Sequence, residues 1–393
     1  MAPHDTDGNT TAGEADEPSR ARRRAARYVV PVTVMGVAAA TIGLVPALAD
    51  SGDPDLPEIT AAQLIEKIAK SDVEQLSGTV KITTDLGLPD LGGLESSLAS
   101  GAMSQGEDDG SAADPATRLT ALASGTHTLR VATDGPERQK LSLLEDAAEY
   151  SLIHNGKDVW GYDSESNEVY HGTVDEPVGK AEEERPPATP KDFAEEALKS
   201  VDDTTSVTVD GTAQVAGRDA YKLVIKPEQP GSTVGAISVA VDHRTGMPLK
   251  FTLTPAAGGA AVVDVGFTKV SFDKPAASTF DFTPPKGAKV TEEGDLDKGG
   301  RPEHEPEKDL GKGPDGMTML GEGWTTVATF DTGGAGLPAG GFLDSLGDKV
   351  KGDFGTGTVF STRLINALVT EDGTVYAGAV TKQALVKAAE EAK

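Results

Sequence analysis

The sequence has no cysteine and few aromatic residues, and both absences restrict what the protein does. Among 393 residues there is no Cys, and Phe, Trp and Tyr together make up 5%. The lack of Cys excludes disulfide bonds, thiolate metal sites and a Cys nucleophile. It also excludes a lipid-modified N-terminal Cys, so this chain is not itself a lipoprotein.

The motifs of several enzyme classes are absent as well. The chain contains no HExxH, GxSxG or Walker A pattern, which are the usual signs of zinc peptidases, hydrolases and nucleotide-binding enzymes. Ser271 and Lys274 match SxxK, but they end a predicted strand instead of opening a helix. Residues 163–167 imitate the start of an EF-hand, with Glu168 where that loop needs Gly. We therefore expect no enzyme, with no catalytic residue, no metal and no cofactor.

Positive charge is also scarce. There are 36 Lys and Arg against 63 Asp and Glu, which gives a net charge of −27. An acidic exterior repels phosphate backbones. We therefore expect no nucleic-acid partner.

The N-terminus carries a basic cluster followed by a long apolar run. Residues 1–27 are a polar tail that ends in five Arg, and residues 28–48 are uncharged. Ala47-Leu48-Ala49 fits a cleavage site, and the Arg cluster should stay in the cytoplasm. Residues 28–49 are a signal peptide or a single membrane anchor, and both interpretations stay open. In either case we expect residues 50–393 to be extracytoplasmic, secreted or membrane-associated.

Most of the remaining chain alternates apolar and polar residues, which is typical of antiparallel strands with one buried face. We count about eleven such strands, all connected by short turns. Asn155-Gly156 is a hairpin signal. The turn residues of 242–246 predict a second hairpin tip, so we do not interpret His243 and Arg244 as catalytic.

The predicted fold class is therefore mainly β, with few helices to cover the apolar side of the sheet. Residues 60–70 and 190–199 have helix-capping patterns, and residues 88–124 are an apolar flap or a disordered loop. Two interpretations stay open: these segments close the core completely, or they form a lid over a cavity that holds an apolar guest. Residues 291–316 are an acidic Gly- and Pro-containing linker, and residues 317–393 a C-terminal extension of strands and a terminal helix.

Four segments carry a resemblance to a known family. HNGKDVWGY (154–162), AGRDAYKLVIK (216–226), VDHRTGMPLKF (241–251) and FDFTPPKGAKV (280–290) resemble, in this order, motifs of the LolA/RseB/LppX superfamily of lipoprotein carriers and related proteins. The resemblance covers about residues 56–290. Ser164 replaces the usual Pro of the first motif, and the insertion 88–124 and the C-terminal extension depart from the carriers. The Ala-, Gly- and Arg-rich composition is typical of an actinobacterial protein.

The resemblance implies an unclosed half-barrel of about eleven antiparallel strands, with helices as a lid over a hydrophobic cavity. Its implied function is extracytoplasmic, non-enzymatic binding of the acyl chain of a lipid or lipoprotein. The alternative is an RseB-like regulator that binds the extracytoplasmic part of a membrane anti-sigma factor or another membrane partner. From the alternation we predict these cavity residues: Leu129, Val131, Leu141, Leu143, Tyr150, Leu152, Trp160, Tyr221, Leu223, Ile225, Ile237, Val239, Val241, Leu249, Phe251 and Leu253.

Overall fold

The structure is a computed structural model of the whole chain, and residues 54–393 form one compact unit within it. It describes the following residues: 54–87, 111, 113–115, 118, 122, 124–173, 188–292, 317–331 and 347–392. The predicted signal or anchor segment 28–49, most of the flap 88–124 and nearly all of the linker 291–316 lie outside these residues. In the described part of the chain no helix is long and apolar enough to cross a bilayer.

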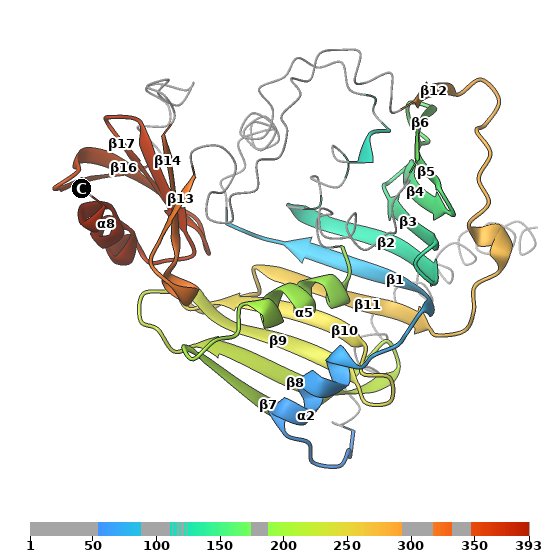
Figure 1. Ribbon diagram of the computed structural model, residues 1–393, viewed down its shortest axis with the longest axis horizontal. Helices are drawn as coiled ribbons and strands as arrows, with labels where there is room; N and C mark the ends of the chain where they lie inside the picture. Colours follow the sequence, from blue (N-terminus) through green and yellow to red (C-terminus); the bar gives the residue numbers. More distant parts are fainter. Residues whose placement is uncertain are drawn as a thin grey trace, which may run out of the picture. The chain divides into compact units, whose positions relative to one another are not determined.

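One large sheet dominates the unit (Figure 1). Its strand order is β12-β6-β5-β4-β3-β2-β1-β11-β10-β9-β8-β7, with β12 and β7 at the two edges. The strands are β1 (Gln75–Thr84), β2 (Gly125–Asp134), β3 (Arg138–Leu144), β4 (Glu149–Asn155), β5 (Asp158–Asp163), β6 (Glu168–Thr173), β7 (Thr205–Val215), β8 (Arg218–Pro227), β9 (Val234–Asp242), β10 (Pro248–Pro255), β11 (Val263–Ser271) and β12 (Lys289–Glu292).

The sheet confirms the predicted fold class of a mainly β, unclosed half-barrel. Strands β1 to β11 pair antiparallel, as the alternation predicts. The twelfth strand was not expected: β12 pairs parallel with β6, with Lys289 opposite Glu168. It comes from the segment that resembles the ending motif of the superfamily.

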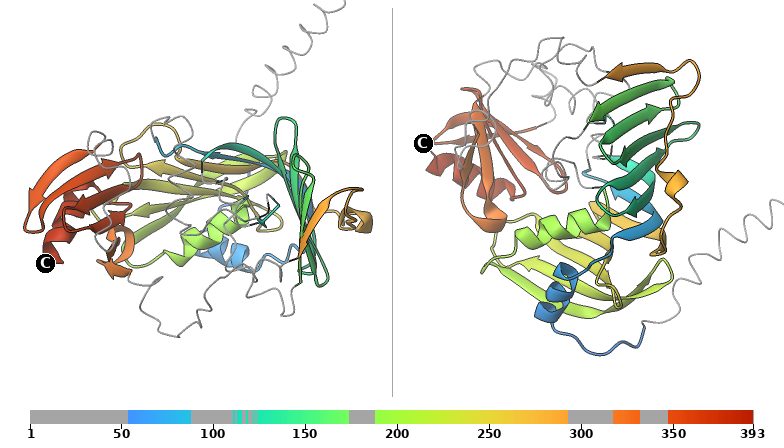
Figure 2. Two further views of the ribbon diagram at one scale, coloured as in Figure 1. Left: turned by 90° about the horizontal axis from the view of Figure 1, so that it is seen from above. Right: turned by 45° about the vertical axis from the view of Figure 1, so that its right-hand side comes forward.

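Two short helices lie on one side of this sheet (Figures 1 and 2). Helix α2 (Ala61–Ala69) begins with a capping box between Thr60 and Gln63. Helix α5 (Pro190–Lys199) begins with a second capping box, between Thr189 and Asp192. Helix α2 packs on β7 and β8, and α5 packs on β9, β10 and β11. We call the side of the sheet that they cover the inner face, and the opposite side the outer face.

A second sheet of six strands follows, in the order β13-β14-β18-β17-β16-β15. Its strands are β13 (Thr318–Leu320), β14 (Val327–Asp331), β15 (Asp348–Gly352), β16 (Gly355–Ser361), β17 (Asn366–Thr370) and β18 (Thr374–Gly378). The terminal helix α8 (Lys382–Glu391) has Thr381 as its N-cap. Leu385 of this helix and Leu368 of β17 are fully buried in the core of this sheet. The exact boundaries of the predicted domains stay a prediction.

The two sheets are joined by direct contacts. Ser232 and Val380 form an isolated β-bridge, and the Thr233 amide donates to the Ala379 carbonyl at 2.9 Å. The indole Nε1 of Trp324 donates to the Thr205 hydroxyl at 2.7 Å. These bonds give the second sheet backbone attachment to β9 and side-chain attachment to β7.

The turn at 242–246 forms as predicted and connects β9 to β10. One carboxylate oxygen of Asp242 accepts hydrogen bonds from the backbone amides of Arg244, at 3.0 Å, and Thr245, at 2.8 Å. The other oxygen accepts a hydrogen bond from Arg218 Nε at 2.5 Å. Burial opposes the charge, but these hydrogen bonds from Arg218 and Thr245 outweigh it and lower the pKa of Asp242. His243 Nδ1 lies 3.1 Å from the Asp219 carbonyl, so its ring supports the turn.

Candidate ligand-binding face

The register of the large sheet fixes which side chains share the inner face, because directly paired residues point to the same side. Phe251 on β10 packs against Phe193 of α5 with ring centroids 5.2 Å apart, which places Phe251 on the inner face. Phe251 pairs with Val265 and Val239, and Val265 pairs with Ile82. Starting from these pairs, the alternation along each strand assigns the remaining strand residues to the inner or the outer face.

All of the predicted cavity residues except Trp160 share this face. Two paired rows cross β1 to β4: Val80, Leu129, Leu143 and Tyr150 in one, and Gly78, Val131, Leu141 and Leu152 in the other. The remaining predicted residues lie on β8, β9 and β10: Tyr221, Leu223, Ile225, Ile237, Val239, Val241, Leu249, Phe251 and Leu253. Whether they bind a ligand stays a prediction.

Trp160 lies on the outer face, which corrects the prediction. It pairs with Ile153 and His171, so the alternation of β5 directs Val159 and Gly161 to the inner face instead. The Trp160 ring stacks on His171 at 3.8 Å between centroids and lies 5.6 Å from Phe282. The indole therefore packs under the segment that leads to β12.

Beneath α5, the inner face is filled in the described part of the chain, as in the interpretation in which the helices close the core. Leu223, Val239 and Leu249 are fully buried in one continuous core that includes the small residues of α5. Short residues such as Ala194 let this helix approach the sheet closely, so little space is left beneath it.

Two of the open hollows in the described part of the chain each have a predicted cavity residue in their lining, Tyr221 in one and Val131 in the other. One of about 690 Å³ lies between α2 and the 242–246 turn, with Lys67, Glu66 and Arg244 among its lining residues. The other, of about 480 Å³, is lined mainly by outer-face side chains of β1, β2, β3 and β11. Both linings include charged side chains, and the second also includes the apolar residues Val131 and Val270.

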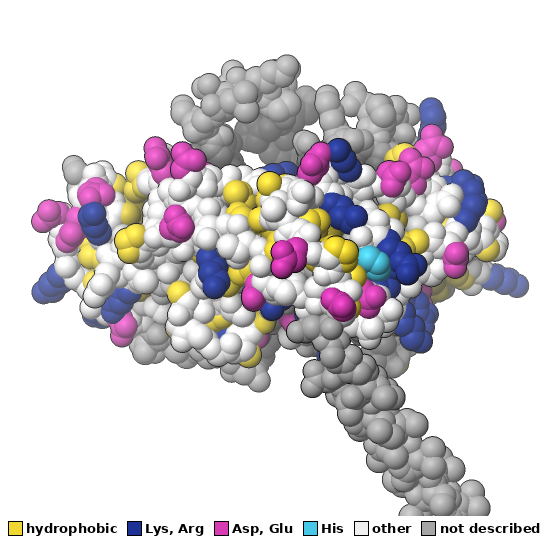
Figure 3. All heavy atoms as spheres, turned by 90° about the horizontal axis from the view of Figure 1, so that it is seen from below, with side chains coloured by type: hydrophobic (Ala, Val, Ile, Leu, Met, Phe, Trp, Pro, Cys, Tyr) yellow, Lys and Arg dark blue, Asp and Glu magenta, His cyan; other side chains and the backbone are white. Residues whose placement is uncertain are grey.

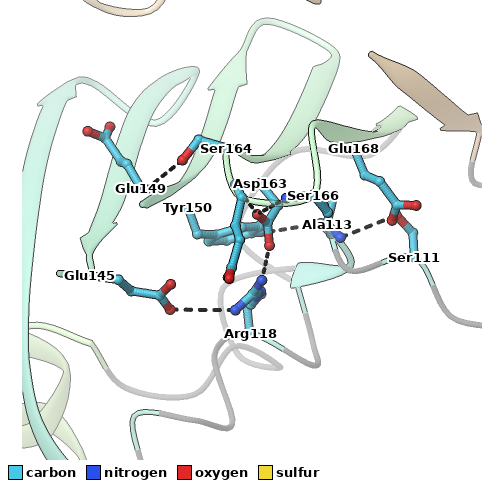
Figure 4. Close-up of polar contacts among 11 residues, drawn as sticks. Ser111, Ala113, Arg118, Glu145, Glu149, Tyr150, Asp163, Ser164, Ser166 and Glu168 are labelled. Carbon is cyan, nitrogen blue, oxygen red and sulfur yellow. Dashed lines mark hydrogen bonds and ion pairs between the residues drawn. The ribbon is translucent and has the colours of Figure 1, made fainter. Parts of the chain in front are cut away.

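A polar cluster lies at one end of the inner face, on β4, β5 and β6 (Figure 4). The Tyr150 hydroxyl is buried and donates to the Ala113 carbonyl at 3.2 Å. Gly161 makes this approach feasible, because a Cβ there would collide with both groups. Burial raises the pKa of Tyr150, so the phenol stays neutral and acts as a hydrogen-bond donor.

An ion pair completes this cluster. Arg118 pairs with Asp163, whose side chain is 2% exposed, and lies 3.5 Å from Glu145. The other Asp163 oxygen accepts the amides of Glu165 and Ser166 at 2.7 and 3.1 Å. The carboxylate is thus fully engaged in a turn and an ion pair, so it offers no free base.

The Ser111 hydroxyl donates to Glu168 at 3.1 Å. Together with the Tyr150 and Arg118 contacts, this bond attaches Ser111, Ala113 and Arg118 to the inner face of β4, β5 and β6 (Figure 4).

The SxxK match at Ser271 and Lys274 also has a structural role. Ser271 bonds to Asp273 at 2.8 Å, and Lys274 pairs with Asp134 at 3.3 Å. Ser271 and Lys274 thus each pair with an aspartate and not with one another. No group of His, Asp and Glu that could hold a metal ion occurs among the residues that the structure describes.

Sequence reasoning missed three inner-face residues: Arg118, Asp163 and His154. His154 follows Tyr150 and Leu152 at the same spacing of two, so the alternation of β4 was a usable signal. Asp163 was interpreted as part of an EF-hand imitation and as a position of the first superfamily motif, not as an inner-face residue. Arg118 lies in an irregular segment, where no periodic pattern indicates what a side chain contacts.

The surface seen from the β7 side is mixed in charge and polarity (Figure 3). Basic and acidic side chains are interspersed there, with hydrophobic side chains in small groups between them. A nucleic-acid interface instead has its basic residues gathered into a patch or stripe.

No family profile and no curated protein matches the chain. Among solved structures it is similar to MucB of Pseudomonas aeruginosa in complex with MucA, with 15% identity over 84% of this chain and 96% of that one, at a TM-score of 0.39. It is also similar to a LolA superfamily protein of Nitrosomonas europaea, with 12% identity over 57% and 99% of the two chains, at a TM-score of 0.22. An uncharacterized conserved protein of Thermus thermophilus has 13% identity over 59% and 98%, at a TM-score of 0.31. At these scores the fold assignment depends on the strand order and register described above.

Proposed function

We propose that this protein is a non-enzymatic binder of acyl chains, belonging to lipids or lipoproteins, that acts outside the cytoplasm. The acyl chain would lie on the inner face of β2, β3 and β4. It would be held by apolar burial and released without any covalent step.

One observation carries this proposal: an apolar patch that the two described inner-face helices do not pack on. Leu129, Val131, Leu141, Leu143 and Leu152 form two adjacent rows on β2, β3 and β4, whereas α2 and α5 pack on β7 to β11. Val131 and Leu141 are only half-buried. Leu129, Leu143 and Leu152 are buried, so a ligand would enter at Val131 and Leu141 and would have to displace the groups that cover the other three.

The magnitude of apolar burial is sufficient for useful affinity. Each buried methylene contributes about 0.8 kcal/mol. A dozen methylenes would contribute roughly 10 kcal/mol before the costs of ordering the chain and losing its freedom are subtracted. Binding of this kind is reversible and needs no cofactor.

The extracytoplasmic location is supported by the sequence of the N-terminus. Arg residues precede the uncharged run 28–48, which is followed by a cleavage-like Ala47-Leu48-Ala49. Cleaved and anchored forms both place the sheet on the same side of the membrane.

Substitution at adjacent positions on opposite faces tests the proposal. Leu141→Asp places a charge in the patch, and we expect it to weaken binding of a fluorescent fatty acid at least tenfold, because a buried unpaired charge is strongly unfavourable. Lys140→Asp makes the matched change on the outer face and should leave binding unchanged. Absence of fatty-acid binding by the unmodified protein would refute the proposal.

A second candidate function is regulation through a membrane-protein partner. It is favoured by apolar residues at the β13–β14 edge of the second sheet, where Met319 is 61% exposed and Phe330 is 36% exposed. Met319 pairs with Ala328, so Met319 and Phe330 share one face. Exposed large apolar side chains at a sheet edge are typical of contact surfaces for other proteins.

Purification from the native host separates the two candidates. The acyl-binder proposal predicts lipid in the organic extract of the purified protein. A membrane protein that co-purifies with the unmodified chain, and is lost in a Met319→Lys and Phe330→Lys double variant, would instead favour the regulatory function.

A further inference from the structure

His154 is a buried histidine on the inner face whose ring has no hydrogen-bond partner. It lies on β4, two residues after Leu152, and pairs with Gln139 and Val159. Its exposed fraction is 2%, and neither Nδ1 nor Nε2 makes a hydrogen bond to any residue that the structure describes. The residue was not among the predicted cavity residues.

Such a side chain is unfavourable for folding alone. A neutral imidazole carries one N–H donor and one acceptor nitrogen, and burying both without partners costs their desolvation. The great majority of buried side-chain polar atoms in proteins are hydrogen-bonded, so an exception calls for a reason other than stability. A leucine at this position would pack on the same face without that cost.

The position of His154 relative to the apolar patch indicates that reason. Along β4 the patch begins at Tyr150, beside the Arg118–Asp163 ion pair, and ends at His154. Four residues of strand span about 14 Å. This is close to the length of one acyl chain, since the hydrocarbon core of a bilayer is about 30 Å thick and two chains deep.

The two ends of the patch differ in chemistry. At the Tyr150 end the charged groups are paired with each other and with backbone amides. At the other end His154 offers one donor and one acceptor, and both are unused. An uncharged head group that contains an ester carbonyl and a hydroxyl would complement the two nitrogens.

We propose that His154 recognises the neutral, hydroxyl-bearing ester head of an acyl ligand, of the monoacylglycerol class, whose chain lies along Leu152 and Leu141. This inference rests on the proposed function and specifies its ligand. The chain would provide most of the affinity, and His154 would determine which head group is preferred.

Competition with two ligands of equal chain length tests it. Monododecanoylglycerol and dodecane would each displace a fluorescent hydrocarbon probe from the full chain. For His154→Leu we expect monododecanoylglycerol to bind about tenfold more weakly, the effect of two lost hydrogen bonds. Dodecane should bind the variant as well as before or better, and His154→Gln should restore part of the preference.

Two further measurements keep the test independent of folding defects. His154→Leu should unfold at the same temperature as the unmodified protein or higher, because it removes unsatisfied buried groups. In the unmodified protein, monododecanoylglycerol should shift the His154 ring-nitrogen resonances, and dodecane should not.

The outcomes distinguish the two proposals. Suppose that the unmodified protein binds the hydrocarbon probe, and that His154→Leu weakens the binding of monododecanoylglycerol and dodecane equally or changes the binding of neither. The role of His154 is then refuted and the acyl-binder function stands. If the unmodified protein binds no probe and no competitor, both proposals are refuted.

Discussion

The two halves of the large sheet bury their inner faces in different ways. On β7 to β11 the side chains lie under α5 and α2, and residues such as Leu223 and Leu249 are fully buried among other apolar groups. On β1 to β6 the inner face combines buried Leu129 and half-buried Leu141 with an Asp163 ion pair and with His154, which has no hydrogen bond to a described residue. We call these the helix-covered half and the mixed half.

The comparison separates stability from binding within a single sheet. A dry, close-packed interface such as α5 against β10 contributes much of the folding free energy and is costly to alter. A surface of mixed polarity contributes less to stability, and its contacts can be exchanged at low cost. The mixed half is therefore where a ligand can be accommodated without loss of the fold.

The largest expected effect is a difference between identical substitutions in the two halves. Leu249→Ala should lower the free energy of unfolding by about 3 kcal/mol, because it leaves a cavity in a packed core. Leu141→Ala should lower it by only about 1 kcal/mol, because its side chain is partly exposed already. Urea denaturation of both variants measures the difference. Equal losses would mean that the two halves are packed alike.

An intermediate effect is expected from the ion pair of the mixed half. Arg118→Leu should cost about 2 kcal/mol, because it leaves the buried Asp163 carboxylate unpaired. Adding Asp163→Asn should recover most of that loss, since the amide oxygen still accepts the turn amides. Lys382→Leu breaks an exposed pair with Asp348, 2.8 Å long, and serves as the control with a cost of at most about 0.5 kcal/mol. A double variant less stable than Arg118→Leu would contradict this account.

The smallest expected effect concerns pH and the edge strand β12. Burial disfavours the charged ring, but hydrogen bonds to Asp158 at 3.0 Å and Glu292 at 2.8 Å outweigh it and raise the pKa of His171. Because the pKa of His171 is raised by folding, its protonated ring stabilises the folded state. This stabilisation is fully present below the unfolded-state pKa of about 6.5 and is lost as the pH rises through the folded-state pKa.

Hydrogen exchange can detect the change. The amides of β12 should lose protection between about pH 6 and pH 9, after correction for intrinsic exchange, while the amides of the opposite edge strand β7 should not. In His171→Asn, β12 should be weakly protected at both pH values. Equal protection of β12 across this range would show that His171 does not hold the strand.

Much of the helix-covered half was predictable from the sequence. Alternation in β8 to β10 identifies the buried residues because each strand keeps a strict period of two, and capping residues such as Thr60 and Thr189 mark the helix starts. The 242–246 turn is equally local. In such segments neighbouring residues contain the information that determines the structure.

The mixed half was less predictable because its contacts are distant in sequence. Arg118 and Asp163 are 45 positions apart, and the arginine lies outside any periodic segment. Trp160 was predicted on the cavity face, whereas the register of β5 against β4 and β6 places it on the outer face beside His171. The four residues of β12 are too few to show a period, and their partner strand ends far earlier in the chain.

The parallel pairing of β12 has a consequence for how the chain is made. The β6 edge receives its last partner only through contacts that span 121 positions, such as Lys289 with Glu168. Until residues 289–292 have been synthesised, the β6 edge presents unpaired amides and carbonyls, which can pair with other nascent chains. Truncation before β12 would therefore threaten solubility during biogenesis more than it would threaten the finished core.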